Sequence, residues 1–328
     1  MTETPSIVVT NRIFAETAER LATVGTVVVN PSEEPWPHDE LLGHASRAEA
    51  MMAFMTDRID AAFLAACPKL KIIAAALKGY DNIDVAAAEE AGVWVSIVPD
   101  LLTAPTAELA IALMLALGRN VLASDRRIRA EGFHGWRPTF YGRGLAGATV
   151  GIIGYGAVGQ AIARRLSGFD CRILATDLNF ASDETTELAP FERIIAVSDY
   201  VVLALPLTSA TKYILDRETI ARMKPGALLV NPARGSLVDE AAVAEALASG
   251  HLAGYAADVF QCEDWAQADR PSGVDPRLIA PDAPTVLTSH IGSAVIEVRR
   301  AIEASAAESI IEALSGHAPR ELANFRQK

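Results

Sequence analysis

The feature that most constrains the fold is a glycine-rich turn, Gly154-Tyr155-Gly156-Ala157-Val158-Gly159, between an apolar run and an Ala- and Ile-rich segment. The run Thr149–Ile153 has the character of a strand, and the segment after the turn that of a helix. In this setting the first glycine permits the turn, the second lets the backbone approach a pyrophosphate, and the third packs helix on strand. The sequence therefore predicts a βαβ unit that binds a dinucleotide, with its phosphates at a helix N-terminus.

An acidic residue, Asp177, ends the next predicted strand, Arg172–Thr176. At this place a carboxylate can bind the ribose 2′-hydroxyl of NAD and would repel the 2′-phosphate of NADP. Leu178 and Asn179 add no cation that would offset this repulsion. We therefore expect NAD as the cofactor; the alternative is a structural turn with Asp177 facing solvent.

The chain is long enough for two domains, because its 328 residues exceed what a single hydrophobic core usually holds. Hydrophobic residues make up 51%, and strand-like runs alternate with helix-like ones, which indicates a globular α/β fold. The net charge of −12 argues against nucleic acid or an anionic membrane as partner. It does not exclude a small anionic substrate, because a local group of cations can oppose the overall charge.

The cysteines and the N-terminus indicate the compartment. Cys67, Cys171 and Cys262 lie far apart and without metal-ligand spacing, so we expect free thiols, no metal site and a reducing environment. The first residues, 1–6, lack the basic segment of a secretory signal. The longest apolar stretch, 109–117, is too short to span a bilayer. These features predict a soluble cytoplasmic protein.

Other elements are assigned from apolar periodicity and from Gly and Pro residues. Strands are expected at residues 7–10, 24–29, 72–77, 93–98, 200–205, 227–230, 254–259 and 285–287. Helices are expected at 14–21, at 107–129 after Pro99 and Pro105, and at 293–314, where the last helix can return to the first domain. The stretch 132–147, rich in Gly and aromatic residues, is expected to be an irregular arm or lid.

Three residues of different chemistry, Arg234, Glu263 and His290, each follow a strand-like run in the second half of the chain. The carboxyl ends of strands in an open α/β sheet converge on one crevice, so these side chains can meet above the dinucleotide. A carboxylate hydrogen-bonded to an imidazole fixes its tautomer and lets the other nitrogen act as a general base. An arginine offers a planar cation to a substrate oxyanion, although a structural pair between Arg234 and Asp239 is equally compatible with the spacing.

Taken with further motifs, the chain resembles the D-isomer-specific 2-hydroxyacid dehydrogenase superfamily over nearly its whole length. The matching segments are 151–159, Leu205-Pro206-Leu207-Thr208, 223–226, 230–239, Ala257-Asp258-Val259-Phe260 and His290-Ile291-Gly292. The resemblance implies two Rossmann-like doubly wound domains, a discontinuous flavodoxin-like substrate domain (1–101 and 292–328) and a central NAD-binding domain (102–291), with catalysis in the cleft. It also implies a homodimer whose contacts involve residues 106–147.

The resemblance also implies roles for individual residues. Arg234, Glu263 and His290 would bind the substrate anion and move the proton while hydride passes to nicotinamide. Beyond the glycine turn and Asp177, the residues implied to contact NAD are Thr106, Leu205, Pro206, Pro232, Ala233, Asp258 and Gly292.

One departure from the family's pattern indicates a narrower branch. The usual Glu-Pro is here Glu263-Asp264-Trp265, which resembles phosphite dehydrogenases, as do the stretches 51–55, 77–82, 98–103, 136–142 and 290–295. In that branch the lysine that matches Lys78 contacts phosphite, beside backbone amides near Gly79. The other residues implied to form the substrate pocket are Met55, Leu102, Trp136, Tyr141, Arg234 and Ser293.

Charge gives a separate argument for this branch. Phosphite near neutral pH is largely a dianion, whereas a 2-hydroxy acid presents one carboxylate that one arginine can hold. A second cation, Lys78, would favour desolvation of the dianion, although a solvated loop lysine is the commoner fate of a single Lys. Arg299 can add positive field or form a structural salt bridge.

The sequence thus predicts oxidation of phosphite to phosphate with hydride transfer to NAD, in which His290 takes a proton from the attacking water. One alternative is a D-2-hydroxyacid dehydrogenase or a glyoxylate/hydroxypyruvate reductase. An alternative of another class is an NAD(H)-sensing interaction module, which would bind NADH with little turnover.

Overall fold

The computed structural model describes residues 4–98, 100–177, 185–265, 267 and 269–325. The chain forms two compact units. Unit 1 comprises residues 1–102, 265–268 and 294–328, and unit 2 comprises residues 103–264 and 269–293. The boundaries predicted from the sequence are 101/102 and 291/292. Of the residues named above, Pro99, Leu178 and Asn179 lie outside the described part of the chain.

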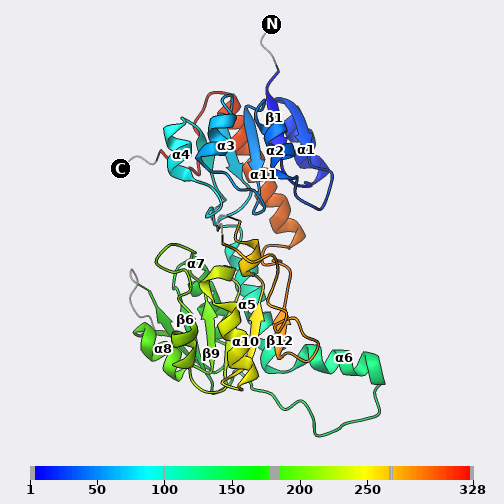
Figure 1. The fold of residues 1–328 in the computed structure, drawn as a ribbon, viewed down its shortest axis with the longest axis vertical. Coiled ribbons are helices and arrows are strands. Elements are labelled where there is room, and N and C mark those ends of the chain that lie inside the picture. Colours follow the sequence, from blue (N-terminus) through cyan, green and yellow to red (C-terminus); the bar gives the residue numbers. More distant parts are fainter. Residues whose placement is uncertain (1–3, 99, 178–184, 266, 268, 326–328) are drawn as a thin grey trace. The chain divides into compact units, whose positions relative to one another are not determined.

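Unit 1 is built on a five-stranded parallel sheet with the strand order β2-β1-β3-β4-β5. Its strands are β1 (Ser6–Val9), β2 (Thr26–Val29), β3 (Ala50–Ala53), β4 (Ile72–Ala75) and β5 (Trp94–Ser96). Its helices are α1 (Ala15–Ala22), α2 (His38–Ala45), α3 (Ala61–Ala66), α4 (Val85–Glu90) and α11 (Ile296–Leu314), shown in Figure 1. The order is that of flavodoxin-like sheets, in agreement with the predicted fold.

Both faces of this sheet are buried, which explains why its strands are continuous apolar runs. Along β3, Met51 and Ala53 face one core with α2, α3 and α4, while Ala50 and Met52 face the other with α1 and α11. Helix α11 begins at Ile296 and not at the expected Ser293. Val295, just before the helix, has an extended backbone with φ −104° and ψ 126°, and a turn at 292–293 precedes it.

Unit 2 is built on a seven-stranded parallel sheet with the order β12-β11-β10-β9-β6-β7-β8. The strands are β6 (Thr149–Ile153), β7 (Arg172–Thr176), β8 (Thr186–Leu188), β9 (Tyr200–Leu203), β10 (Ala227–Asn231), β11 (Leu252–Ala257) and β12 (Thr285–Leu287). The order reverses between β6 and β9, as in dinucleotide-binding sheets. The predicted Rossmann-like α/β fold is therefore confirmed for this unit.

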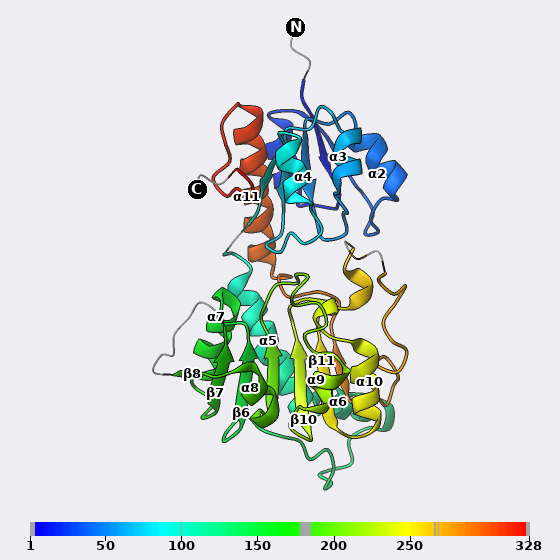
Figure 2. The same cartoon turned by 60° about the vertical axis from the view of Figure 1, so that its left-hand side comes forward.

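Helices cover both faces of the second sheet. They are α5 (Thr103–Gly118), α6 (Val121–Glu131), α7 (Ala157–Leu166), α8 (Phe191–Val197), α9 (Arg217–Ala221) and α10 (Glu240–Ala248), with two short 3-10 helices, η1 (Gly235–Leu237) and η2 (Gln261–Glu263). Helices α5 and α7 lie on one face of the sheet and α8, α9 and α10 on the other (Figure 2). Each set packs through apolar side chains, which form two separate cores. The two layers hold the strand ends, and the loops that leave them, in place.

The single long helix predicted at 107–129 is wrong. The structure has two helices there, α5 and α6, which meet at 59°. The break lies at Asn120, whose φ of 54° is left-handed and cannot continue a right-handed helix. Just before it, a Cβ on Gly118 would come within 2.1 Å of the Tyr200 hydroxyl oxygen, so the end of α5 passes directly against that side chain.

Helix α5 is a central core helix of unit 2, with Ala107, Leu113 and Met114 buried. Pro105, expected before the helix, lies inside its first turn, where proline is tolerated because the N–H it lacks has no partner there. Within the described part of the chain no single helix is long and apolar enough to cross a membrane. Only the bent pair of α5 and α6 reaches that length and composition together.

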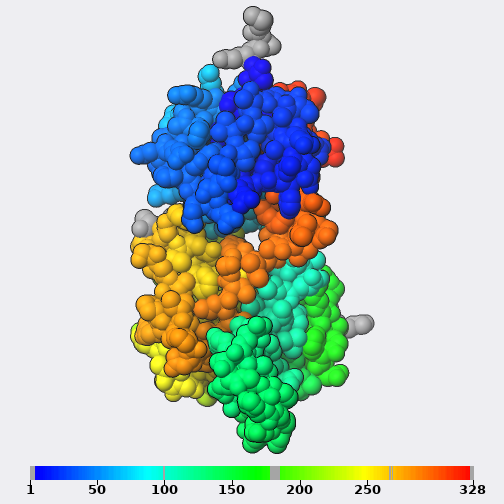
Figure 3. Space-filling view, turned by 90° about the vertical axis from the view of Figure 1, so that its right-hand side faces the viewer, coloured from blue at the N-terminus to red at the C-terminus, as the bar shows by residue number. Residues whose placement is uncertain are grey.

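Helix α6 and the segment after it project from unit 2 as an arm (residues 121–143). Helix α6 has no buried residue, and the segment 132–143 has neither helix nor strand, as predicted. Phe133, Trp136 and Tyr141 are 72%, 77% and 79% exposed. The space-filling view shows the arm standing on the surface of unit 2, in green (Figure 3).

A buried carboxylate, Asp57, joins two loops at the carboxyl edge of the unit 1 sheet. It accepts hydrogen bonds from the Thr10 hydroxyl at 2.5 Å and from the Phe54 amide at 2.7 Å. The Asn82 amide group donates to the carbonyls of Phe54 and Asp57, at 3.0 and 2.7 Å, and so ties the loop after β4 to the loop after β3. Burial raises the pKa of Asp57 to about 6, against the opposing effect of these two donors.

Asp57 should make stability depend on pH. Its folded-state pKa of about 6 lies above the value of 3.8 for a free aspartate, so its stabilising contribution is present at low pH and lost as the pH rises through about 6. Asp57→Asn keeps an acceptor oxygen without the charge. We expect its stability relative to wild type to rise by on the order of 2 kcal/mol between about pH 4 and about pH 8.

Urea unfolding of both proteins at the two pH values measures this difference. Asp84→Asn, which changes an exposed helix cap of the same unit, controls for the loss of one acidic charge. Parallel pH dependence of wild type and Asp57→Asn would contradict the assignment.

Candidate active site

The site is built where three neighbouring strands of unit 2 end. β10, β11 and β12 are adjacent and parallel, with Asn231 paired to Ala257 and Ala257 paired to Leu287. The loops that follow them carry Arg234, Glu263 and His290. Parallel pairing therefore brings these three loops to one edge of the sheet, as the sequence predicts.

Glu263 and His290 are in direct contact. The imidazole Nδ1 lies 2.9 Å from Glu263 Oε2. The other carboxylate oxygen of Glu263 accepts from the Phe260 amide at 2.9 Å, which fixes the side chain at the start of η2. The His290 side chain is 29% exposed and the Glu263 side chain 27%. With the Nδ1 proton donated to the carboxylate, Nε2 is the acceptor, and it is the nitrogen placed for proton exchange with a substrate.

The loop of His290 is organised by Asp258, at the end of β11. One carboxylate oxygen accepts from the Thr288 hydroxyl at 2.6 Å and the Ile291 amide at 2.8 Å, and the other from the Gly292 amide at 2.8 Å. His290 has a left-handed φ of 55°, which these contacts maintain. Asp258, implied by the resemblance to contact the cofactor, therefore also holds the histidine loop.

Arg234 lies in a turn fixed by Asn231. The Asn231 side-chain amide donates to the Arg234 carbonyl at 2.8 Å, and its oxygen accepts from the Ala233 amide at 3.1 Å. Asp239, the partner considered in the structural alternative for Arg234, instead caps α10 by accepting from the Ala241 and Ala242 amides, each at 3.1 Å. The role of Arg234 toward a substrate stays a prediction.

The glycine turn fits a dinucleotide. Gly154 has a φ of 95°, and a Cβ there would meet the Ala204 carbonyl oxygen at 2.4 Å. A Cβ on Gly159 would meet the Gly154 oxygen at 2.2 Å, so this glycine lets α7 pack on the turn. At Gly156 a Cβ would meet nothing within 4 Å, which leaves open space at the N-terminus of α7 for phosphate. Asp177 Oδ2 accepts from the Tyr155 amide at 2.8 Å, beside this space.

The remaining implied cofactor contacts lie at the same edge of the unit 2 sheet. A Cβ on Gly292 would come 3.5 Å from the Thr106 hydroxyl, which places the first turn of α5 beside the histidine loop. The others directly follow β9 and β10, namely Leu205, Pro206, Pro232 and Ala233, and Ser293 follows Gly292.

Several implied substrate residues lie in unit 1. Met55 follows β3, and Lys78 and Gly79 follow the neighbouring strand β4, so all three are at one edge of that sheet. The Arg299 guanidinium lies 5.8 Å from the Phe54 ring centre, a cation–π contact, and its burial lowers the pKa of Arg299. Leu102 packs against the same core as Phe54. Trp136 and Tyr141 are on the exposed arm of unit 2.

Arg299 has no salt bridge within the described residues. The carboxylate of Glu303 acts on Arg299 through its negative charge. Its hydrogen bonds, however, come from the Phe14 amide at 2.9 Å and the Thr17 hydroxyl at 3.2 Å. Of the two readings of Arg299, the structural salt bridge is therefore not found in this part of the chain.

An open hollow of about 500 Å³ flanks the histidine loop in unit 2. Its lining is mostly apolar and contains no charged group: Phe260, Val274, Ile279, Leu287, Thr288, Ser289 and Ile291. Among the described residues, no group of His, Cys, Asp or Glu side chains is arranged to hold a metal ion.

Two acidic residues next to the site, Glu240 and Asp264, were not assigned from the sequence. Both are almost fully buried, at 2% and 3% exposed, and both accept hydrogen bonds from backbone amides of the catalytic loops. One feature of the sequence could have indicated them: each is an acidic residue directly after a residue already singled out. Asp264 follows Glu263, and Glu240 follows Asp239.

Comparison with known proteins gives a consistent family. Residues 111–292 match the family described as D-isomer specific 2-hydroxyacid dehydrogenase, NAD binding domain. A glyoxylate reductase of Pyrococcus furiosus is 37% identical over 98% of this chain and 95% of its own length. The structure of a glyoxylate reductase from Paecilomyes thermophila matches with a TM-score of 0.85 at 27% identity, covering 100% of both chains. An NAD-dependent formate dehydrogenase from Staphylococcus aureus, solved with NAD, matches with a TM-score of 0.79 at 25% identity, covering 94% of this chain and 95% of its own.

Removal of the imidazole should stop turnover and spare coenzyme binding. We expect His290→Ala to lower kcat by about 10²–10⁴-fold, the contribution of a positioned acid–base group, while NADH affinity stays within about threefold. Glu263→Gln should have an intermediate effect, because it keeps a hydrogen-bond acceptor but loses the charge. NADH absorbance measures kcat, and NADH fluorescence titration measures binding.

His251→Ala is a matched control, since its ring contacts only the Ile220 carbonyl, at 2.9 Å, among the described residues. This variant should retain kcat. A His290→Ala enzyme with most of its activity would remove His290 from the chemistry.

Proposed function

Because this chain belongs to the D-isomer-specific 2-hydroxyacid dehydrogenase family, we propose that it transfers hydride between NAD(H) and a small 2-oxo or 2-hydroxy acid. Glyoxylate is the substrate that the named relatives favour. The observation that carries the proposal is the contact of 2.9 Å between Glu263 and His290 at the carboxyl edge of a dinucleotide-binding sheet. This is a positioned proton donor and acceptor beside the expected place of nicotinamide.

In the proposed reduction, glyoxylate, NADH and a proton give glycolate and NAD⁺. The bound nicotinamide supplies the hydride. Arg234 binds the substrate carboxylate through its planar guanidinium. His290 Nε2 donates the proton to the carbonyl oxygen, and Glu263 stabilises the charged ring and holds its orientation. In the reverse direction His290 takes the hydroxyl proton.

Phosphite is a second candidate, and the comparisons do not favour it, because relatives that are 37% and 35% identical over 98% of this chain are named glyoxylate reductases. Two observations keep it in view. The first is the phosphite dehydrogenase-like sequence at Glu263-Asp264-Trp265 and around Lys78. The second is the partly buried Arg299 guanidinium beside Phe54, which together with Lys78 would give unit 1 two cations for a dianion.

A substrate panel separates the two candidates. We expect NADH oxidation with glyoxylate, and we measure it against NAD⁺ reduction with phosphite, D-lactate and D-glycerate by absorbance. Turnover with phosphite alone would replace the first proposal by the second. NADH binding without turnover on any substrate would favour an interaction module.

Lys78→Ala tests the cation of unit 1. If the substrate is a dianion, the variant should raise the KM for that anion at least about tenfold, because one of its counter-charges is lost, while the KM for the coenzyme is unchanged. With glyoxylate, whose single carboxylate is assigned to Arg234, the increase should be smaller. Equal effects on substrate and coenzyme would mean that Lys78 is not a substrate ligand.

We also propose that the partner of this chain is a second copy of itself. The arm exposes Val121, Leu122 and Ile128 on a helix without buried residues. An isolated helix of this length is marginal in water, so a covering surface would stabilise it. Five arginines of the arm, Arg126, Arg127, Arg129, Arg137 and Arg143, also contrast with the net charge of −12 of the chain.

Light scattering should therefore give twice the chain mass of 34.8 kDa. We expect Leu122→Glu to shift the mass toward one chain, because a charge would be buried in the apolar contact. Glu297→Leu, a charge change on helix α11 of unit 1, is the control. A wild-type protein with the mass of one chain would contradict the proposal.

A further inference from the structure

The loops of Arg234 and Glu263 are joined by more than proximity. At Gly235 a Cβ would lie 1.9 Å from the Phe260 carbonyl carbon and 2.2 Å from the Gln261 nitrogen, so the two backbones are in direct contact. Next to this contact the buried Asp264 carboxylate accepts from the Ser236 amide at 2.6 Å. One side chain of the Glu263 loop thus holds the backbone of the Arg234 loop.

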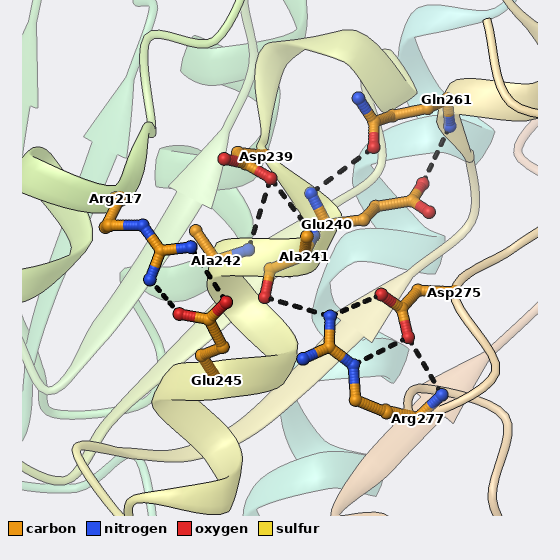
Figure 4. Close-up of polar contacts among 9 residues, drawn as sticks. All are labelled: Arg217, Asp239, Glu240, Ala241, Ala242, Glu245, Gln261, Asp275 and Arg277. Atoms are coloured by element: carbon orange, nitrogen blue, oxygen red, sulfur yellow. Dashed lines mark hydrogen bonds and ion pairs between the residues drawn. The ribbon is translucent and has the colours of Figure 1, made fainter.

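A second set of contacts closes this junction from the other side. The Ser236 carbonyl accepts from the Tyr213 amide at 2.8 Å, and the Tyr213 hydroxyl accepts from the Gln261 side chain at 2.9 Å. The backbone amide of Gln261 donates to the Glu240 carboxylate at 2.7 Å (Figure 4). Helix η2, which ends in Glu263, is therefore held on both sides.

The two acids are unfavourable for stability in this position. Asp264 and Glu240 are 3% and 2% exposed, and burial raises the pKa of Glu240, with Asp264 adding to the effect. Burial of a carboxylate costs free energy through desolvation, and hydrogen bonds from backbone amides offset this cost only in part. The amides they bind belong to the two loops that carry the cation and the acid of the site, so the purpose suggested by the contacts is loop geometry.

We propose that Asp264 is a positioning residue that locks the Arg234 loop to the Glu263 loop, so that the guanidinium and the imidazole act on the same substrate molecule. This inference rests on the proposed function. Asp264 itself does not touch the reacting atoms. It acts through Ser236 on one loop and through η2, Glu263 and His290 on the other.

The test compares Asp264→Leu, Asp264→Ala and Asp264→Asn. Leu and Ala cannot accept from the Ser236 amide, and each should lower kcat/KM for glyoxylate by about 10²-fold, through both kcat and the substrate KM. The dissociation constant of NADH should change less than the substrate KM, because the glycine turn that would bind the phosphates is not involved, although Pro232 and Ala233 belong to the loop that Asp264 holds. Asn retains an acceptor oxygen and should recover activity to within about tenfold of wild type.

Asp199→Leu is the matched control. Asp199 also binds a backbone amide, that of Thr149 at 3.0 Å, but it precedes β9 and lies at the amino edge of the same sheet, opposite the site. This variant should lose thermal stability and keep kcat/KM. Equal losses of kcat/KM in Asp199→Leu and Asp264→Leu would reduce Asp264 to a structural role and overturn the proposal.

A readout independent of activity is the thiol of Cys262, inside η2. Burial, followed by the charges of Glu240 and Glu263, raises its pKa and slows its reaction. In a Cys171→Ser background, where Cys67 is buried, release of η2 should speed the reaction of Cys262 with an aromatic disulfide reagent about tenfold in Asp264→Leu and not in Asp199→Leu.

The two measurements separate the possible failures. If wild type turns over no substrate of the panel, the proposed function fails, and the thiol rate still decides whether Asp264 locks η2. An unchanged thiol rate, or wild-type kcat/KM in Asp264→Leu, would overturn the inference. If Asp264→Leu does not fold, Asp264→Ala takes its place in both measurements, and Asp264→Asn remains the variant that keeps the acceptor.

Discussion

The parallel pairing of β10, β11 and β12 is the constraint on which the site depends. The pairs Leu229–Tyr255 and Ala257–Leu287 align these strands so that they end at nearly the same level. Loops leaving them begin side by side, and residues 27 and 28 positions apart in sequence become hydrogen-bonded neighbours. An antiparallel strand here would send one of the three loops to the opposite edge. The loops of Arg234, Glu263 and His290 thus lie at one edge only because the three strands run in the same direction.

Loops at this edge have backbone amides that the sheet cannot satisfy, and buried carboxylates accept from them. Asp258 does this for the histidine loop and Asp264 for the arginine loop, while Asp57 does it for the corresponding edge of unit 1. Each acid is unfavourable to bury, but each accepts from amides that would otherwise lack a partner. Rigid loops without regular secondary structure result, and these can hold a proton-transfer group within hydrogen-bond distance of a substrate.

Similarity in short motifs and similarity over the whole chain indicate different substrates for this protein. Short stretches such as Glu263-Asp264-Trp265 resemble the phosphite branch, whereas relatives that are 37% and 35% identical over 98% of the chain are named glyoxylate reductases. The fold and the Glu263–His290 pair serve either reaction, because both combine hydride transfer with the movement of a proton. The two reactions differ in the number of positive charges needed around the anion. Asp264, part of the stretch that suggested phosphite, accepts a hydrogen bond from the backbone of the arginine loop.

Local sequence determined much of the architecture. Periodicity and glycine spacing located β6, β7 and β12 with their observed bounds, the glycine turn, and the ends of β10 and β11 to within two residues. These features depend on residues close together in the chain. The end of α5 was missed because it depends on the left-handed Asn120 and on Gly118 packing against Tyr200, about eighty residues away. The functions of Asp258, Asp264 and Glu240 were also decided only by tertiary structure. A carboxylate has no specific role until it is known which backbone amides lie within hydrogen-bond distance, and that depends on which loops the sheet brings together.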